Sequence, residues 1–351
     1  MSACQGAQPY YGTTPVDQGQ RAVQPPVSGV ATPGSSWERV SPEQAGWSPE
    51  HLEEAKRRFH ELGATGLVVV YKGRLLAAWG DVTTPVNCHS VRKSFMSALL
   101  GIYAHEKRLT LSKTLGELGI DDYTPLTATE KSATVYDLLK ARSGVYLPAV
   151  METPKMKATR PLRGSHAPGT FFYYNNWDFN ALGTIFEQAA KRSIFSAFDE
   201  KIGRPIGMEH FRADRCRYAS SKKTMHRGYR FFMSTLDRAR FGLLYLREGR
   251  WGSKQIIPKA WVTESTRVHS KGSKGIGYGY LWWVSTGRWH LGARVRGKAY
   301  SARGNWGQKI IVLPDHQVVV AVSSSRKRGY PNAAGRKFKR VFSSIVRAMP
   351  R

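Results

Sequence analysis

Hydrophobic and polar positions along this chain follow two different periods, and the change from one to the other predicts its organisation. Ser48-Pro49-Glu50 is typical of a helix start, with Ser as N-cap and Pro in the first turn, and the pattern predicts a helix that ends at Leu62 before Gly63. Two apolar runs follow, 66–71 and 74–80, separated by Lys72-Gly73. They predict a β-hairpin whose strands are largely buried.

The middle of the chain has a different pattern from its two ends. Between about Ser90 and Met225 strand signals nearly vanish, and helical stretches such as 135–141 and 179–191 alternate with loops. Strand patterns return at 278–284, 293–302, 308–313 and 316–323, and a final helix is predicted over 332–349. We therefore expect an α+β fold in which one antiparallel sheet, built from both chain ends, is flanked by helices and carries a mostly helical inserted region.

The same pattern gives expected domain boundaries. Residues 1–36 are rich in Gln, Pro, Gly, Ser and Thr, which predicts a flexible N-terminal arm. Residues 37–90 and 226–351 are expected to form the α/β domain, and 91–225 the mostly helical domain. A functional site should lie at the seam between the two.

Composition limits the classes of protein to consider. The 351 residues include 54 Lys and Arg against 25 Asp and Glu, a net charge of +29, yet 41% are hydrophobic and 11% aromatic. The charge therefore sits on a folded globule and not on a disordered chain. The 3 cysteines are too few and too scattered for a disulfide framework or a zinc site with paired ligands. We expect no metal and no cofactor.

The positive charge is concentrated near the C-terminus. From Arg267 to Arg351 there are 18 Lys and Arg and a single acidic residue, Asp315. Contact with an anionic envelope polymer is one interpretation, and a solvated basic face is the other. No nucleic-acid-binding module is recognisable, so no specific nucleic acid is expected, and the sequence predicts no oligomeric state.

The N-terminus bears on localisation. Ser2-Ala3-Cys4 resembles the site at which bacterial lipoproteins are processed, where two small residues precede the lipid-carrying Cys. A periplasmic or lipoprotein location through Cys4 and a plain cytoplasmic one are both open at this point.

A candidate nucleophile occurs at Ser90-Val91-Arg92-Lys93, an S-x-x-K pattern at the start of an apolar helical run. Residues three apart lie on one face of a helix, so the Lys93 amine can take the proton of Ser90 if burial or a second cation lowers the pKa of the amine. The pattern also occurs at 220–223 and 324–327, so by itself it is weak.

A second motif supports the first. Pro168-Gly169 leads into Tyr174 and Asn176, just before a predicted helix. A phenol beside a Lys ammonium can have a depressed pKa and exchange protons with a nucleophile or leaving group, while an amide can hold the Lys or the substrate.

S-x-x-K followed by P-G-x-x-x-x-Y-x-N resembles the serine β-lactamase and penicillin-binding superfamily, in particular its class C-like branch of family VIII carboxylesterases and 6-aminohexanoate-dimer hydrolases. The resemblance runs from about Trp47 to the final helix, with supporting strings such as 137–144, 237–244 and 277–283. It implies a β-lactamase-like fold, with Ser90 as nucleophile, Lys93 as its base, Tyr174 as proton shuttle and Asn176 as an orienting amide.

The third motif of that family departs from its pattern here. The family carries Lys-Thr/Ser-Gly, or a His or Trp variant, on the strand that lines the site. The matching stretch is either Ala302-Arg303-Gly304 or Asn305-Trp306-Gly307, and Arg142-Ser143-Gly144 lies in the helical part. We expect the substrate or the oxyanion to be bound by the five residues Arg303, Gly304, Asn305, Trp306 and Gly307. Loss of the Lys and hydroxyl favours ester or amide hydrolysis, although Arg303 can still bind a carboxylate.

The sequence therefore predicts a serine hydrolase that cleaves esters or amides through an acyl-enzyme. The alternatives are a β-lactamase or D,D-peptidase on the same residues, and a catalytically silent binder of anionic polymers. A Ser-His-Asp site using His89, His166 or His226 is disfavoured, because no G-x-S-x-G elbow is present. Among the aromatic residues of 278–306 we expect one or two to wall a substrate pocket.

Overall fold

The computed structural model describes residues 29–325 and 335–350. Most of the predicted N-terminal arm lies outside the described residues, as do Cys4, the basic run 326–328 and the predicted first residues of the final helix. Residues 29–36 contain no helix or strand.

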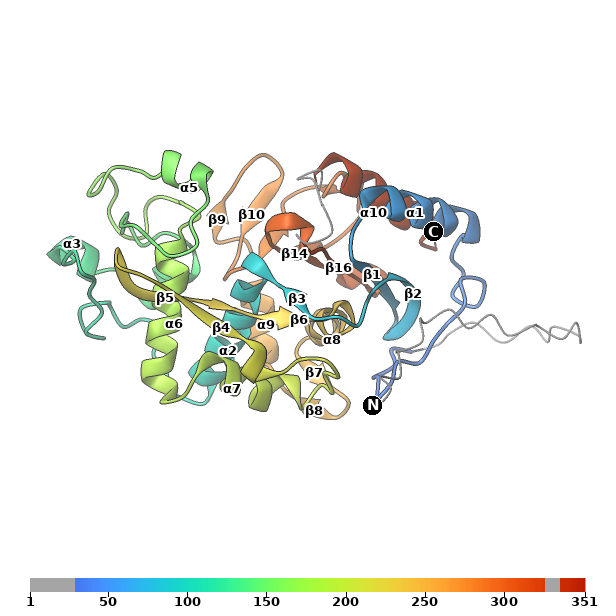
Figure 1. The fold of residues 1–351 in the computed structure, drawn as a ribbon, viewed down its shortest axis with the longest axis horizontal. Coiled ribbons are helices and arrows are strands. Elements are labelled where there is room, and N and C mark those ends of the chain that lie inside the picture. The colour runs from blue at the N-terminus through green and yellow to red at the C-terminus, as the bar shows by residue number, and fades with distance from the viewer. Residues whose placement is uncertain (1–28, 326–334, 351) are drawn as a thin grey trace, which may run out of the picture.

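An eight-stranded antiparallel sheet forms the centre of the molecule, in the order β2-β1-β16-β15-β14-β11-β10-β9 (Figure 1). Its first two strands come from the N-terminal part of the chain and the other six from the C-terminal part. In sheet order they are β2 (Arg74–Gly80), β1 (Gly66–Tyr71), β16 (Val318–Ser323), β15 (Lys309–Leu313), β14 (Tyr300–Arg303), β11 (Trp283–Ser285), β10 (Ile276–Tyr278) and β9 (Ser270–Lys271). The predicted hairpin is confirmed, with Lys72 and Gly73 both at positive φ in its turn.

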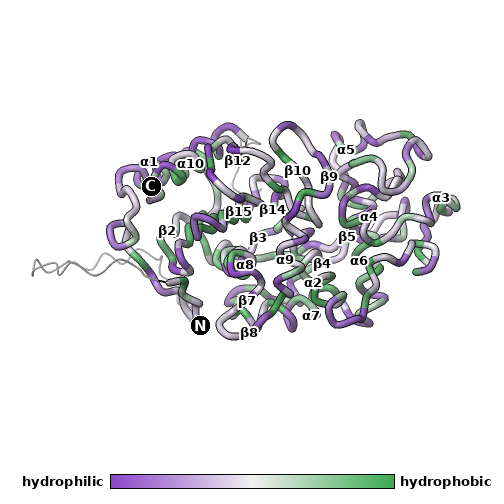
Figure 2. The backbone as a smooth tube through the Cα atoms, turned by 180° about the vertical axis from the view of Figure 1, so that it is seen from behind, coloured by the Kyte–Doolittle hydropathy of each residue, from purple (hydrophilic) through white to green (hydrophobic). Residues whose placement is uncertain are grey.

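Helices α1 (Pro49–Leu62) and α10 (Arg336–Ala348) lie side by side over one face of the sheet (Figure 1). The predicted caps of α1 are confirmed, because the Ser48 side chain accepts from the His51 N–H and Gly63 ends the helix at φ 70°. Both helices alternate between hydrophilic and hydrophobic residues along their length (Figure 2). Each helix buries one apolar stripe, which in α10 consists of Phe338, Val341, Phe342 and Ile345. The stripes pack on side chains such as Val69, Ile311 and Val320 to form one core cluster.

The opposite face of the sheet carries the second and larger core. Helix α8 (Thr235–Leu246) packs on β1, β15 and β16, and alternate strand residues such as Val68, Ile310 and Val319 point toward it. Central strands buried on both faces explain why β1, β15 and β16 are almost uninterrupted apolar runs.

The rest of the chain lies beside the sheet and is mostly helical (Figure 1). Its elements are β3 (Val86–Asn87), η1 (His89–Val91), α2 (Arg92–His105), α3 (Ala128–Lys131), α4 (Val135–Leu139), α5 (Pro154–Ala158), α6 (Asn176–Ala190), α7 (Ile194–Phe198), η2 (Asp199–Gly203), η3 (Ala213–Arg215), β4 (Arg217–Ser221), β5 (Thr224–Arg230), β6 (Phe232–Met233), β7 (Arg250–Trp251), β8 (Lys254–Gln255) and α9 (Lys259–Ser265). The α+β fold with a sheet from both chain ends is confirmed. The domain boundaries themselves stay a prediction.

Three local expectations are wrong, the first being that 293–302 is one strand, because β13 (Ala293–Arg294) and β14 are separate strands there. The β4–β5 hairpin falls where strand signals were expected to vanish, and its strands are short and half exposed. The stretch 278–284 is not one strand, because β10 ends at Tyr278 and β11 begins at Trp283. Between them the chain turns with Leu281 at φ 64°, and a Cβ on Gly279 would lie 2.2 Å from the Ser265 carbonyl oxygen. Glycine is needed there because the backbones approach so closely.

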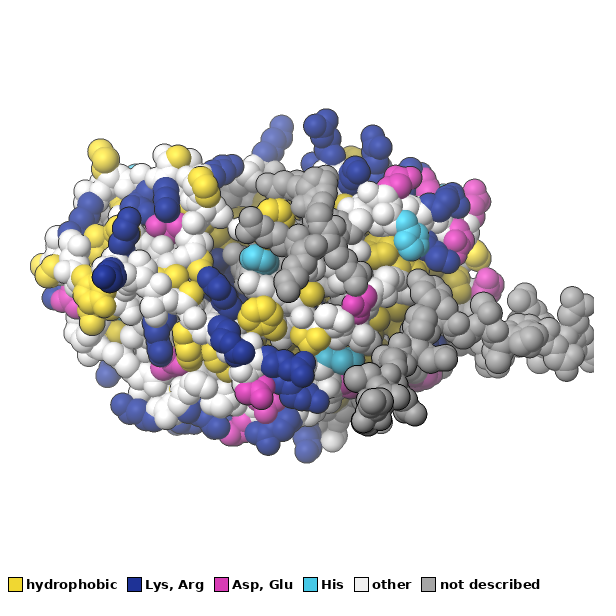
Figure 3. Space-filling model, viewed as in Figure 1, with side chains coloured by type: hydrophobic (Ala, Val, Ile, Leu, Met, Phe, Trp, Pro, Cys, Tyr) yellow, Lys and Arg dark blue, Asp and Glu magenta, His cyan; other side chains and the backbone are white. Residues whose placement is uncertain are grey.

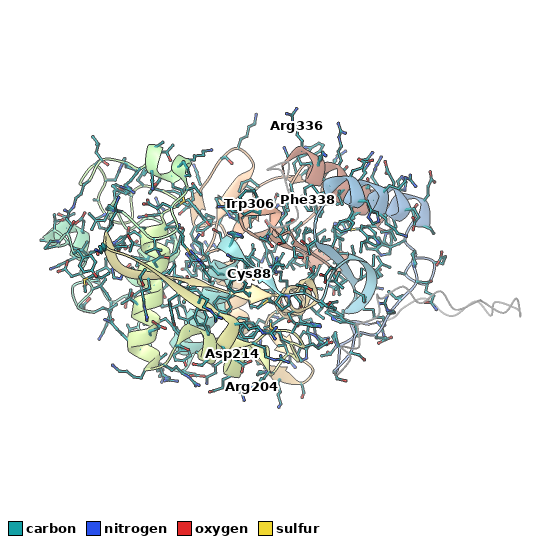
Figure 4. All side chains as sticks on the ribbon, in the orientation of Figure 1. Cys88, Arg204, Asp214, Trp306, Arg336 and Phe338 are labelled. Carbon is teal, nitrogen blue, oxygen red and sulfur yellow. The ribbon has the colours of Figure 1, made fainter. Side chains whose placement is uncertain are left out.

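The surface is as basic as the composition implies. Lys and Arg side chains are spread over the face in Figure 3 and outnumber the acidic ones. Arg336, Lys337, Lys339 and Arg340 are exposed on α10, with Arg336 labelled at its start in Figure 4. Their contact with an anionic polymer stays a prediction. No helix among residues 29–325 and 335–350 is long and apolar enough to cross a membrane.

Candidate active site

Ser90 lies at the point where the sheet meets the helical part. It belongs to η1 (His89–Val91), which leads directly into α2 (Arg92–His105), and most of α2 is buried. The turn is fixed by its neighbours: the Cys88 N–H donates to the Phe231 carbonyl at 2.9 Å, and the His89 N–H donates to the Asn87 side chain at 2.9 Å. His89 has φ 48°, an uncommon conformation for a residue other than glycine. The Ser90 side chain is only half-buried, which leaves it open to a substrate.

Lys93 joins the two other predicted catalytic residues. Its Nζ lies 2.9 Å from Ser90 Oγ and 2.8 Å from Tyr174 Oη. Tyr174 comes from the loop before α6, whose first turn is capped by the Asn175 side chain accepting from the Trp177 N–H. The sequence therefore predicted correctly that a local pair on α2 and a phenol 81 residues further on meet in space.

The electrostatics of this group assign its proton positions. Burial, together with the charge of Arg92, holds the pKa of Lys93 well below the usual 10.5. Burial raises the pKa of Tyr174 to about 12, and the nearby Ser90 hydroxyl offsets only part of that rise. The expected depression of the phenol pKa by a Lys ammonium is therefore wrong. These shifts favour the neutral amine and the protonated phenol, which is the arrangement a base and a proton donor need.

Residues that the sequence did not single out support this group. The Arg92 guanidinium donates to Asn180 Oδ1 at 3.0 Å and stacks 4.0 Å from the centroid of the Tyr229 ring. Two of the aromatic residues predicted from the sequence also pack on Tyr174: the Trp283 ring stacks on it with centroids 5.2 Å apart, and the Tyr278 ring meets it edge-on at 5.8 Å. Trp282, by contrast, is fully buried in the core, and Trp289 is 62% exposed.

The strand that carries the candidate third motif approaches Ser90 closely at a glycine. A Cβ on Gly304, at the end of β14, would lie 3.0 Å from the Ser90 nitrogen and 2.6 Å from the Cys88 carbonyl oxygen. Figure 4 shows Cys88 and Trp306 in the middle of the molecule, where these segments come together. Of the two candidate matches, Ala302-Arg303-Gly304 lies on the strand and Asn305-Trp306-Gly307 in the turn that follows.

Sequence comparison decides the family. Residues 52–341 match the family Beta-lactamase. The chain belongs to the β-lactamase family. No curated protein sequence matches it.

Solved structures of the β-lactamase fold resemble this chain over most of its length. A penicillin-binding protein homologue from Caulobacter crescentus has a TM-score of 0.64 at 14% identity, covering 87% of this chain and 99% of that one. A candidate 6-aminohexanoate-dimer hydrolase from Bacillus anthracis has a TM-score of 0.63 at 19% identity, covering 94% and 91%. EstCE1, a hydrolase with promiscuous acyltransferase activity, has a TM-score of 0.60 at 14% identity, covering 84% and 97%. At these identities the likeness shows the fold alone.

The other residues that the family resemblance predicts for the site lie on β14 and in the turn after it. The Gly304 N–H donates to the Gln308 carbonyl at 2.9 Å, so this N–H is not free to bind an oxyanion. The absence of a side chain at Gly304 instead lets the end of β14 approach Ser90 closely. The predicted oxyanion-binding role of Asn305, Trp306 and Gly307, in the turn that follows, stays a prediction. In this turn Trp306 has φ 61° and Gly307 φ 86°. Arg303 donates from Nε to Ser301 Oγ at 2.8 Å.

Asn176 makes contacts other than the expected ones. Its Nδ2 donates to the Met151 carbonyl at 2.7 Å and to the Val150 carbonyl at 3.4 Å, and its Oδ1 has no hydrogen-bond partner among residues 29–325 and 335–350. Val150 and Met151 are among the residues that line a cavity of about 440 Å³ between the loop 148–160 and the β4–β5 hairpin. Asn176 thus holds the loop, and its role toward Lys93 or a substrate stays a prediction.

In the part of the chain that the structure describes, no other S-x-x-K pattern and none of the three candidate histidines forms a second site with a Ser nucleophile and a buried base. Ser220 and Lys223 are exposed on the β4–β5 hairpin, and Lys327 lies outside the described residues. His166 stacks on Phe171 with centroids 4.0 Å apart, and His226 Nδ1 pairs with Thr184 Oγ1 at 2.9 Å. Of the described side chains, Lys93 is the base that reaches Ser90 Oγ.

Proposed function

We propose that this member of the β-lactamase family is a serine hydrolase that cleaves carboxylic esters or amides through an acyl-enzyme on Ser90. The observation that carries the proposal is the position of Lys93 Nζ, within hydrogen-bond distance of both Ser90 Oγ and Tyr174 Oη. Burial that lowers the pKa of this amine favours its neutral form, and a neutral amine can take the proton of the nucleophile beside it.

The proton can follow a closed path in the proposed cycle. Lys93 takes the Ser90 proton as Oγ attacks the carbonyl carbon. The oxyanion would accept from the Ser90 N–H and from an N–H of the turn 305–307, close to the partial positive charge at the start of α2. Tyr174 then protonates the leaving alcohol or amine and regains a proton from the Lys93 ammonium. Water attacks the acyl-enzyme by the same path in reverse.

The third element favours esters and amides over β-lactams. With either match, Ala302-Arg303-Gly304 or Asn305-Trp306-Gly307, the Lys and hydroxyl that hold a β-lactam or peptidyl carboxylate are changed. An Arg binds carboxylates through a planar fork and does not reproduce a Lys and a hydroxyl at the same place. Hydrolase and acyltransferase activity in the name of EstCE1 is consistent with this choice.

Intact-mass spectrometry of the acyl-enzyme tests the proposal. The wild type, Ser90→Ala and the control Ser253→Ala, an exposed serine in the turn between β7 and β8, are each mixed with a short-chain p-nitrophenyl ester and with a penicillin. We expect an acyl adduct and turnover of the ester for the wild type and the control, and neither for Ser90→Ala.

The two substrates separate the possible activities. Rapid penicillin turnover would favour a β-lactamase acting on the same three residues. Ester turnover that survives Ser90→Ala in a folded protein would exclude Ser90 as the nucleophile and overturn the proposal.

A further inference from the structure

Three large apolar side chains are exposed at the helical end of the molecule. Tyr123 is 63% exposed, Leu162 83% and Met225 54%. In Figure 3 this end lies at the left, where Figure 1 places α3 and α5, and hydrophobic side chains stand there among those of Lys and Arg. Single exposed apolar residues are common on protein surfaces, so these three point to a function only because they lie together.

Hydrogen bonds bring the three apolar residues close to one another. Asp122 Oδ1 accepts from the Tyr123 N–H at 2.8 Å and from the Met225 N–H at 2.7 Å, so these two residues are neighbours. The arginine that follows Leu162 donates from Nη2 to the Pro125 carbonyl at 2.6 Å. The loop that carries Leu162 is therefore held against the segment that carries Tyr123.

Two exposed lysines lie on the same surface. They line the cavity of about 440 Å³, Lys157 from the loop 148–160 and Lys223 from the turn of the β4–β5 hairpin, two residues before Met225. The acidic residue of the cavity is already paired, because the Glu152 carboxylate accepts from Arg160 Nη2 at 2.6 Å. Among residues 29–325 and 335–350 neither lysine forms an ion pair with Asp or Glu.

The three apolar residues and the two lysines are named here the helical-end surface, which consists of Tyr123, Lys157, Leu162, Lys223 and Met225. It borders the segment that carries the proposed proton donor. Tyr173 donates from Oη to the Met156 carbonyl at 2.6 Å, and Asn176 donates from Nδ2 to the Met151 carbonyl at 2.7 Å. Both carbonyls belong to the loop that lines the cavity.

The chemistry of the helical-end surface identifies its partner. Leu and Met side chains gain free energy by leaving water for an apolar phase, which the phosphate backbone of a nucleic acid does not offer. Lysine is depleted from protein–protein interfaces. An anionic lipid bilayer suits both kinds of side chain, because apolar groups enter the boundary between headgroups and acyl chains while lysines contact the phosphates.

We propose that the helical-end surface docks on an anionic lipid bilayer. Its three apolar side chains insert between the headgroups, and its two lysines contact the headgroup phosphates. This surface is distinct from the basic residues of α10, which lie at the other end of the molecule (Figure 1).

Co-sedimentation of the full chain with lipid vesicles tests the proposal. Vesicles of phosphatidylcholine with about a quarter of phosphatidylglycerol are compared with vesicles of phosphatidylcholine alone, and the wild type should bind the anionic vesicles at least about tenfold more tightly. Added salt should weaken this binding, because it screens the lysines.

Matched variants locate the surface. The double variant Lys157→Gln and Lys223→Gln should weaken binding to the anionic vesicles roughly 10- to 30-fold, since each lysine near such a surface contributes about fivefold. The control Lys337→Gln and Lys339→Gln removes two exposed lysines from α10 and should weaken binding about threefold at most.

A second pair of variants tests the apolar contribution. Leu162→Ser should weaken binding to the anionic vesicles about fivefold, because the side chain no longer leaves water. The control Trp289→Ser changes an exposed ring on β12 (Trp289–His290), which pairs with β13 beside α10, and should leave binding unchanged. All these side chains are exposed, so an unchanged Tm shows that each variant is folded.

Three outcomes would overturn the proposal. Equal losses in the two double-lysine variants would mean that net charge alone binds the vesicles. Equal binding of the wild type to anionic and neutral vesicles would exclude the lysines. Unchanged vesicle binding of Leu162→Ser, with heparin binding that falls in the Lys157 and Lys223 variant, would identify the partner as a polyanion and not a bilayer. None of these results depends on hydrolytic activity, so the test is independent of the proposed function.

Discussion

Gly304→Ala is the sharpest test of how the sheet and α2 cooperate at Ser90. The change adds one carbon atom, which would lie 2.6 Å from the Cys88 carbonyl oxygen and 3.0 Å from the Ser90 nitrogen. Normal contact needs about 3.5 Å, so the segments must separate by roughly 0.5 to 1 Å. Gly304 has φ −133°, which alanine adopts without strain, so the effect is a matter of contact distance.

The magnitude follows from the two neighbours. Both contacts are with backbone atoms, which cannot swing aside as a side chain end can, so the change should cost about 1 to 3 kcal/mol of unfolding free energy. For a chain of this size the Tm should fall by a few degrees. A displacement near 1 Å at the reacting centre can cost about 100-fold in rate, so we expect kcat/KM for a p-nitrophenyl ester to fall by roughly that factor.

Gly287→Ala is the matched control, because a Cβ on Gly287 has no atom within 4 Å. It should leave both the Tm and the turnover of the ester unchanged. Circular dichroism establishes that each variant is folded before its rate is measured. If folded Gly304→Ala hydrolyses the ester within twofold of the wild-type rate, the close approach of β14 to Ser90 is not needed for catalysis.

Three further outcomes are expected. Ester hydrolysis should decline as the pH falls through the pKa of Lys93, at a midpoint well below 10.5, and Lys93→Met should abolish hydrolysis. Because the pKa of Lys93 is lower in the folded chain than in the unfolded one, proton binding favours unfolding below pH 10.5, so Lys93→Met should also raise the Tm near neutral pH. A lowered Tm in this variant would contradict the lowered pKa of Lys93. Tyr174→Phe should reduce kcat by about 100- to 10,000-fold with little change in Tm, as single-turnover kinetics would show, and an unchanged kcat would exclude the phenol as proton donor. Phe338→Ala, which removes a 2% exposed ring from the core beneath α10, should cost about 3 to 5 kcal/mol in urea unfolding, and a loss below about 1 kcal/mol would mean that α10 contributes little to stability.

Local sequence rules were sufficient for part of the site. Ser90 and Lys93 are three residues apart at a helix start, so their proximity is set by the geometry of one turn and needs no knowledge of the fold. Helix α1 and the 72–73 hairpin were predictable for the same reason, since their caps and turn residues act over a few positions.

The parts that depend on distant segments could not be predicted in the same way. Asn176 is two residues from Tyr174, but the chain enters α6 at Asn176, and this change of backbone turns its amide toward Met151. The position of Gly304 depends on the register of β14 against β15, in which a slip of one residue exchanges the faces of the sheet. No local pattern contains that register.

The proposed proton transfer and the proposed oxyanion site depend on different parts of the molecule. The pKa of Lys93 depends on burial within the helical part and on Arg92, which Asn180 and Tyr229 hold there. The proposed oxyanion donors depend on the sheet, through Gly304 and the turn that follows it. If these roles hold, a change on the sheet side alters which substrate carbonyl is bound while the pKa of Lys93, the proposed base, stays the same. This separation explains how the third element can lose the Lys and hydroxyl of the family pattern while Ser90, Lys93 and Tyr174 keep their geometry.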